Sequence, residues 1–456
     1  MCRATGLPRC AGAFAQCYGA EVVEWLLHLP AYCKVGVSFI GILVLYSSGT
    51  PLGIAILVFS VLLPLWAGAG MGGLHYQLAT FGEPQNYILP VIILLLLFFT
   101  EALSKTGRMD RTIGALKEWL KSKHIILAGL PALVGLLPMP AGALFSAPFV
   151  AAVDENGELE LSHKVAINYW FRHLWEYWWP LYPGVILAMQ YSRLPAIWFF
   201  LIQMPFTVVA AVSGYLFILR RIKKEDDEGV GYGRMNTGDV LSAMGPIGLL
   251  VMISLVGSGI LPLMGVEGTL ANLIAMLVGL IAALVAIFSG HASALRPSLR
   301  MLLRKDTWLM IALVIGIQAF SAALVCPVDA TGVTLITGMR DEFVRTGIPL
   351  IAVIMLIPFI SGMVTGVAFG FVGASFPIVF ALIGTEPSTG LLAATTVFAY
   401  SFGYMGMLLS PMHACFVVTA EYFCVTVFGA YRYIAWPVAI ILLTSIILSS
   451  LYYVIF

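Results

Sequence analysis

The stretch from Lys164 to Gln190, KVAINYWFRHLWEYWWPLYPGVILAMQ, determines how the rest of the chain is interpreted. It is long and apolar enough to cross a bilayer. Ionisable side chains and prolines interrupt it at Arg172, His173, Glu176, Pro180 and Pro183. Ionisable groups inside a membrane are costly and usually face a cavity, a partner or a substrate. Backbone groups freed by proline must be satisfied inside the protein or by water. The stretch is therefore either a binding site or an irregular structural helix.

Composition indicates an all-α, multi-pass integral membrane protein. The 456 residues are 60% hydrophobic and 10% charged, and many apolar runs reach the roughly 18 residues that a bilayer span requires. A net charge of +1, without a basic cluster outside the membrane loops, argues against a nucleic-acid partner. The seven cysteines show no CxxC spacing and are interpreted as free thiols, so neither a metal site nor a cofactor is predicted.

Hydropathy and turn residues divide the chain into seven parts. These are an N-terminal extension with an interfacial helix (1–32), scaffold spans (33–123), a hairpin plus broken span (124–192), a span with a cytoplasmic linker (193–237), further scaffold spans (238–346), a second hairpin plus broken span (347–427), and a C-terminal span (428–456). Residues 68–83 and 329–346 are predicted to be connections. In each hairpin, two short apolar arms flank a Pro- or Gly-rich tip, which is typical of re-entrant helices. The second broken span is expected to break near Gly403–Gly406 and Ser410–Pro411.

The distribution of cationic residues predicts how these parts are oriented. With the predicted spans, 17 of the 24 Lys and Arg residues fall on one side, which the positive-inside rule makes cytoplasmic. The first hairpin then enters from the cytoplasm and the second from outside. This is the arrangement of inverted-topology repeats, whose binding elements meet near the midplane of the membrane.

Arg172 and Glu176 are candidate binding residues at positions i and i+4 of a helix, close enough to form an ion pair. They could be only a structural pair, or Arg172 could present its guanidinium to an anionic substrate while Glu176 orients it or exchanges a proton. His173 is expected to point about 100° away from Arg172. It could carry a proton, since its reference pKa is about 6.5, or it could be a helix-packing residue.

Four tryptophans in the same stretch are open to two interpretations. Tryptophan is typical of the membrane interface, but an aromatic wall could also hold a cationic group. These residues are Trp170, Trp175, Trp178 and Trp179. Because Arg172 favours an anion and an aromatic wall favours an amine, a zwitterion would satisfy both.

The hairpin tips and the second broken span supply further candidates. Small residues let a ligand approach the backbone, although they also permit close helix packing in lipid. The tip candidates are Pro140, Ala141, Gly142 and Ser146 in the first hairpin and Ser361, Gly362, Thr365 and Gly366 in the second. On the second broken span, His413 is a candidate ligand or proton carrier.

Two motifs, LLPMPAGALFSAP at 136–148 and INYWFRHLWEYWWPLYPGVIL at 167–187, resemble the signature of a prokaryotic membrane family called domain of unknown function 401. The resemblance covers about residues 30–456. It implies the ion transporter superfamily, whose relatives include gluconate permeases and citrate and dicarboxylate symporters. It also implies two repeats, a scaffold and a moving transport domain, a homodimer, an elevator motion, and organic anions moved with Na⁺ or H⁺. At residues 361–366 the chain reads SGMVTG and lacks the Ser-Asn-Thr signature of the dicarboxylate symporters, so their specificity and Na⁺ coordination do not carry over.

The sequence thus favours a secondary active transporter of a small organic anion or zwitterion in the prokaryotic inner membrane. Coupling to H⁺ through Glu176, His173 or His413 is slightly favoured over coupling to Na⁺ through tip carbonyls. The absence of a GxxxxGK[ST] motif argues against ATP-driven transport. A channel is the main alternative, because broken helices also line pores. An intramembrane enzyme is disfavoured by the absence of HExxH and GxSxG motifs.

Overall fold

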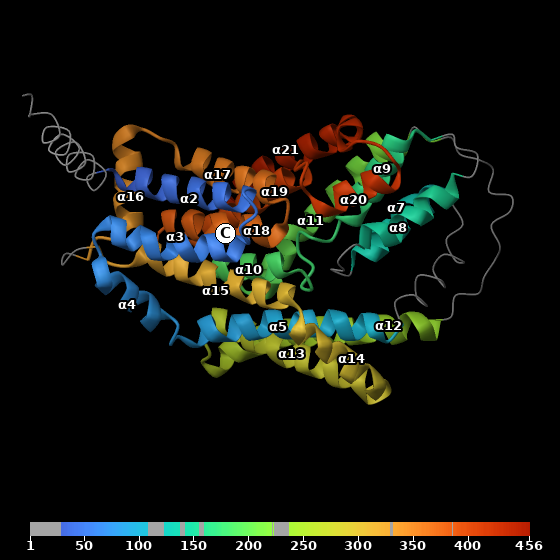
Figure 1. Cartoon of the computed structure of the whole chain (residues 1–456), viewed down its shortest axis with the longest axis horizontal. Helices are drawn as coiled ribbons and strands as arrows, with labels where there is room; N and C mark the ends of the chain where they lie inside the picture. The colour runs from blue at the N-terminus through green and yellow to red at the C-terminus, as the bar shows by residue number, and fades with distance from the viewer. Residues whose placement is uncertain are drawn as a thin grey trace, which may run out of the picture.

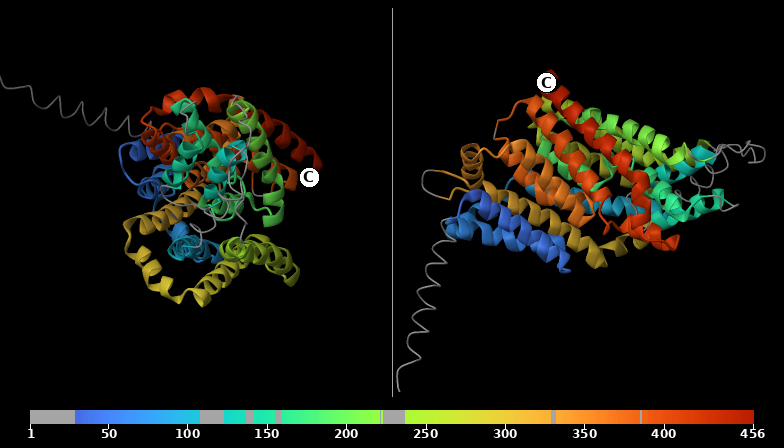
Figure 2. Two further views of the ribbon diagram at one scale, coloured as in Figure 1. Left: turned by 90° about the vertical axis from the view of Figure 1, so that its right-hand side faces the viewer. Right: turned by 90° about the horizontal axis from the view of Figure 1, so that it is seen from above.

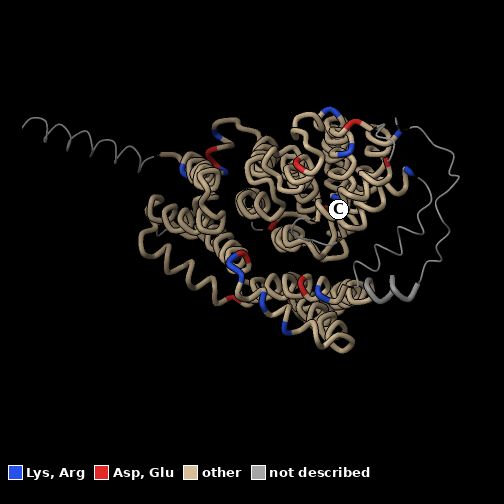
Figure 3. Tube along the Cα trace, turned by 45° about the vertical axis from the view of Figure 1, so that its right-hand side comes forward, with Lys and Arg blue, Asp and Glu red and all other residues tan. Residues whose placement is uncertain are grey.

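The computed structural model describes residues 29–107, 123–136, 142–154, 159–220, 222, 237–328, 332–384 and 386–456. Within these ranges the regular elements are helices, and one isolated β-bridge pairs Pro327 with Thr334. Seven of the described helices are long and apolar enough to cross a membrane: Pro84–Lys105, Ala196–Leu219, Met244–Met264, Gly268–Gly290, Lys305–Val325, Thr389–Leu408 and Val427–Ile455. This is the architecture of an all-helical, multi-pass membrane protein, as the composition predicted. Figure 3 shows how sparse the charged residues are along the chain.

One group of helices forms a layer along one side of the molecule (Figure 1, bottom). It consists of α5 (Pro84–Lys105), α12 (Thr237–Ile260), α13 (Gly268–Gly290) and the short α14 (Leu295–Leu299). Helix α13 packs against both α5 and α12, and α14 packs against α5. The end-on view of Figure 2 shows the same helices grouped together below the rest of the molecule. The layer brings together helices from both halves of the chain.

Helices α3 (Leu52–Ala67) and α15 (Lys305–Val325) connect the two halves of the sequence through a close contact. A Cβ atom at Gly53 would lie 2.6 Å from the backbone nitrogen of Leu313, and one at Gly316 would lie 2.9 Å from the carbonyl oxygen of Gly53. Small residues let helix backbones approach each other in this way within a membrane. Helix α2 (Ala31–Ser47) also packs against α3.

Helices α17 (Leu350–Thr365), α18 (Ala368–Leu382) and α19 (Thr389–Leu408) form the centre of the molecule. Two predictions about this region are wrong. A break was predicted near Gly403–Gly406, but helix α19 continues through both glycines. They allow close helix packing instead: a Cβ at Gly403 would meet the ring of Phe371, and one at Gly406 would meet the backbone of α17. Ser361, Gly362 and Thr365 were predicted to lie at the tip of the second hairpin, but helix α17 continues to Thr365. The turn before α18 is therefore confined to Gly366, at φ 62°, and one further residue.

A third group contains α7 (Lys123–Gly135), α8 (Gly142–Val153), α9 (Leu161–Arg172) and α20 (Ala414–Tyr422). Helices α7, α8 and α9 pack against one another, and α20 packs on α8 and α9 (Figure 1, right). Helix α10 (Pro183–Ser192) continues after the break that follows α9 and packs against α18. Helices α11 (Ala196–Gly214) and α21 (Tyr431–Ile455) pack against each other, and α21 also packs along α19.

The two segments predicted to be connections both contain helices. Helix α4 (Gly70–Thr80) lies within 68–83, and α16 (Leu335–Thr346) lies within 329–346. Local signals explain α16, because Thr334 and Thr337 form a capping box and the left-handed Gly347 ends the helix. The carboxylate of Glu342 on α16 accepts hydrogen bonds from the first two backbone N–H groups of α2, at 2.9 and 3.0 Å. The second connection therefore holds the start of α2 in place.

Candidate functional site

The first broken span separates α9, which ends at Arg172, from α10, which begins at Pro183. Such a break leaves backbone carbonyls without helical partners. Two tyrosines of α19 supply hydroxyl donors. Tyr404 donates to the carbonyl oxygen of His173 at 2.6 Å, and Tyr400 donates to that of Glu176 at 2.5 Å. Because Tyr400 and Tyr404 are four residues apart on one helix face, α19 fixes the path of the break.

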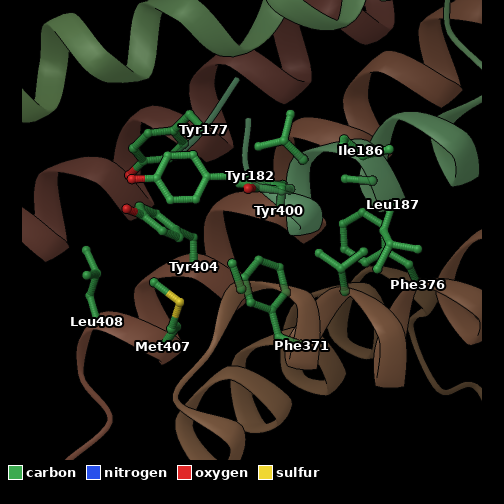
Figure 4. Close-up of a cluster of buried hydrophobic side chains, with 14 of the residues drawn as sticks. Tyr177, Tyr182, Ile186, Leu187, Phe371, Phe376, Tyr400, Tyr404, Met407 and Leu408 are labelled. Carbon is green, nitrogen blue, oxygen red and sulfur yellow. The ribbon is translucent and has the colours of Figure 1, made fainter. Parts of the chain in front are cut away.

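The second broken span, between α19 and α20, is fixed in a reciprocal way. Helix α19 ends at Leu408, and α20 begins at Ala414. The hydroxyl of Tyr169 on α9 donates to the carbonyl of Leu408 at 3.0 Å, and that of Tyr431 donates to the carbonyl of Leu409 at 2.8 Å. Figure 4 shows tyrosines of both broken spans in one buried cluster. Each broken span therefore satisfies backbone groups freed in the other.

The four tryptophans are anchors between helices. Each indole N–H donates a hydrogen bond of 2.8–2.9 Å to another segment. Trp175 and Trp179 donate to carbonyls at the end of α7, which would otherwise lack partners. None of the four lines the cavity at the breaks, so these tryptophans do not form the aromatic wall around a substrate that the sequence allowed.

A cavity of about 310 Å³ lies where the two breaks meet the turn between α17 and α18. Its ionisable lining residues, among those the structure describes, are Arg172, His173, Glu176, Tyr182, His413 and Cys415. The arginine, the glutamate and the two histidines of this set are each 7% exposed or less. Much of the remaining wall is apolar, contributed by α5, α15 and the turn after α17. The cavity combines apolar walls with a few converging polar groups, as small-molecule sites do.

The polar contacts inside the cavity differ from the predicted ones. Because α9 ends at Arg172, Glu176 does not lie one helical turn above it, and the expected i, i+4 geometry is wrong. For the same reason His173 does not point away from the other two residues. Its Nε2 lies 3.7 Å from Oε1 of Glu176 and 3.1 Å from Nε2 of His413. The two histidines, from different breaks, therefore face each other.

The predicted tip residues occupy different places. Gly366 lines the cavity, and Gly142 lies so close to the guanidinium of Arg172 that a Cβ there would collide with it. Ser146 is buried and bonds within α8, to the carbonyls of Gly142 and Ala143. The other three second-tip residues lie outside the lining: Gly362 packs on Gly403, Thr365 bonds the carbonyl of Ser361, and Ser361 is fully buried. Pro140 and Ala141 fall outside the described residues.

Cys415 and Tyr182 line the cavity but are not among the predicted site residues. The spacing His413-Ala414-Cys415 is the signal that could have revealed the cysteine, because it places a thiol two residues from a candidate ligand. Tyr182 immediately precedes Pro183, at the start of α10, and its hydroxyl donates to the carbonyl of Gly135 in α7. Its position depends on the fold and is not visible in the sequence.

The comparisons with known proteins concern almost the whole chain. No curated protein matches the sequence. Among solved structures, that of the Alcanivorax borkumensis YdaH transporter is similar, with 13% sequence identity and a TM-score of 0.44 over 86% of this chain and 88% of that one. The family described as "Protein of unknown function (DUF401)" matches residues 37–455. The match confirms the resemblance of the two motifs, and the chain belongs to the DUF401 family.

Proposed function

We propose that the protein is a secondary active transporter that moves a small organic anion together with a cation. The observation that supports this most is the position of Arg172, whose side chain is 3% exposed and lines the cavity between the two broken spans. A buried guanidinium presents a planar set of donors that fits a carboxylate in a bidentate manner. Apolar walls strengthen such an interaction by keeping water and its high dielectric away.

The cavity also favours an anion over the alternatives raised by the sequence. The tryptophans, which suggested an amine, donate their N–H groups to other helices and lie outside the lining. Among the described residues of the lining, Glu176 is the one acidic side chain, and its Oε1 lies 3.7 Å from Nε2 of His173. A zwitterion would need Glu176 for its ammonium group, so amino acids belong in the panel of test substrates as a direct comparison.

We further propose that transport proceeds by an elevator motion. The cavity lies at the boundary between two proposed units. Helices α5 and α15 of the scaffold supply Leu96, Leu97, Thr100 and Met310. The rest of the lining comes from the two breaks and from the turn between α17 and α18, in the proposed transport units. Movement of these units past the scaffold would carry a bound solute across the membrane. A homodimer, as the resemblance implies, would hold the scaffold still.

The coupling cation is proposed to be H⁺ rather than Na⁺, because the second tip lacks the Ser-Asn-Thr signature of Na⁺-coupled relatives. The role of Arg172 is tested by measuring binding of hydroxy acids, amino acids and sulfonates to the purified protein. Arg172→Gln is expected to abolish binding of the anion found for the wild type. The matched control is Arg304→Gln, which changes a half-exposed arginine paired with Glu101 and Asp306 outside the cavity. Equal affinity in both variants would make Arg172 a structural residue.

A further inference from the structure

We propose that the two breaks together form a binding site for a transition-metal ion of the zinc class, with His173, His413 and Cys415 as ligands and a fourth position open. The nitrogen and sulfur ligand atoms of these three residues all lie within 4.8 Å of one another. The inference does not depend on the transport proposal, because it concerns binding alone.

The distances between the ligand atoms fit a common metal ion. Two imidazole nitrogens bound to tetrahedral zinc at about 2.0–2.1 Å lie roughly 3.3–3.4 Å apart. The Nε2 atoms of His173 and His413 are 3.1 Å apart. Oε1 of Glu176 lies 3.7 Å from Nε2 of His173. A shift of about 0.2–0.3 Å would bring the two imidazole nitrogens to the spacing of a tetrahedral site, and the thiol of Cys415 lies within 4.8 Å of both.

The surroundings of His173 prepare it as a ligand. Its Nδ1 lies 2.6 Å from the backbone carbonyl oxygen of Tyr169, an acceptor that requires a proton on Nδ1. In the neutral ring, Nε2 then carries the lone pair that faces His413. A metal-ligating histidine commonly donates its other N–H group to a backbone carbonyl in this way. The ring of Tyr169 also packs edge-on against both imidazoles, at 4.8 and 5.3 Å, and holds them in place.

The chemistry of the ligand set selects the ion. Thiolate and imidazole suit zinc and copper, whereas sodium and magnesium prefer oxygen ligands. Two neutral imidazoles and a thiolate carry a charge of –1, and the carboxylate of Glu176, 3.7 Å from Nε2 of His173, adds a second negative charge beside the site, so that a divalent ion is neutralised. This balance matters because the positive charge of Arg172 lines the same cavity and would repel a cation in a neutral ligand set. A bound ion would join the start of α20 to the end of α9.

The test uses Co²⁺ as a spectroscopic probe with the purified full-length protein in detergent, after removal of any affinity tag. We expect one equivalent of Co²⁺ to give visible d–d bands and a thiolate-to-cobalt charge-transfer band in the near ultraviolet. Zn²⁺ should displace it, whereas Mg²⁺ and Na⁺ should not. Absence of the charge-transfer band in the wild type would overturn the proposal.

Variants assign the ligands. Cys415→Ser removes only the sulfur and is expected to abolish the charge-transfer band. Its control is Cys326→Ser, a buried cysteine at the end of α15 outside the cavity, which should leave the band unchanged. His413→Ala should weaken binding by more than about 100-fold, because loss of an outer-shell partner alone costs roughly 10–100-fold. Identical spectra for the two cysteine variants would refute the site, and their metal-free unfolding temperatures show whether each is folded.

Discussion

Replacing Tyr404 with phenylalanine removes a single hydroxyl group from the contact between the two broken spans. That hydroxyl donates to the carbonyl of His173 at 2.6 Å, and Tyr404 is fully buried. A buried carbonyl that loses its donor costs about 1–3 kcal/mol. Hydrogen bonds between membrane helices average about 0.6 kcal/mol and reach about 1.7 kcal/mol, because the unfolded state in the membrane finds other partners. We therefore expect Tyr404→Phe to lower the free energy of unfolding by about 1–2 kcal/mol.

The assay is reversible unfolding in mixed micelles, titrated with a denaturing detergent. Tyr452→Phe is the control, because its hydroxyl makes a long bond of 3.3 Å to the carbonyl of Ile202 in a half-buried position. This variant should change the free energy of unfolding by less than about 0.5 kcal/mol. If Tyr404→Phe unfolds at the same denaturant concentration as Tyr452→Phe, the break is not held by α19, and the reasoning about the freed carbonyls is wrong.

Two further substitutions test the surroundings of the site. Gly142→Ala places a methyl group against the guanidinium of Arg172 and should weaken anion binding by about 1 kcal/mol or more. The control is Gly36→Ala, where the added methyl group meets no atom within 4 Å and anion binding should be unchanged. Calorimetric titration compares the two variants, and equal affinities would contradict the contact. Asp154→Asn strands the buried ammonium of Lys164, 2.6 Å away, and should cost about 3–5 kcal/mol in the same unfolding assay. Adding Lys164→Met to this variant should restore most of that loss, and a double variant as unstable as the single one would show that the ion pair is not the cause.

The sequence was sufficient to predict the helical class and the presence of the first break, but not that α9 ends as early as Arg172. Apolar runs mark most of the spans, and Pro180 in the break and Pro183 at the start of α10 mark where a helix cannot continue. His413, which the sequence singled out on the second broken span, lines the cavity together with residues of the first break. These features are visible because they depend on local composition and on backbone chemistry.

Side-chain directions were not predictable, because they depend on where a helix ends. Arg172 is the last residue of α9, so angular spacing could not place His173 or Glu176. The glycines at 403 and 406 resembled a break, yet they serve contacts with neighbouring helices that only the folded structure brings together. The tryptophans likewise satisfy the end of α7, a partner that lies about 40 residues away in sequence.

Uptake into proteoliposomes tests the central claim most directly. The purified protein is reconstituted, and radiolabelled organic anions are supplied with pH and Na⁺ gradients imposed separately. A coupled transporter should raise the internal concentration of its substrate above the equilibrium level under one of these gradients, and Arg172→Gln should abolish that accumulation. Uptake that never exceeds the equilibrium level under either gradient would contradict coupled transport and favour a channel.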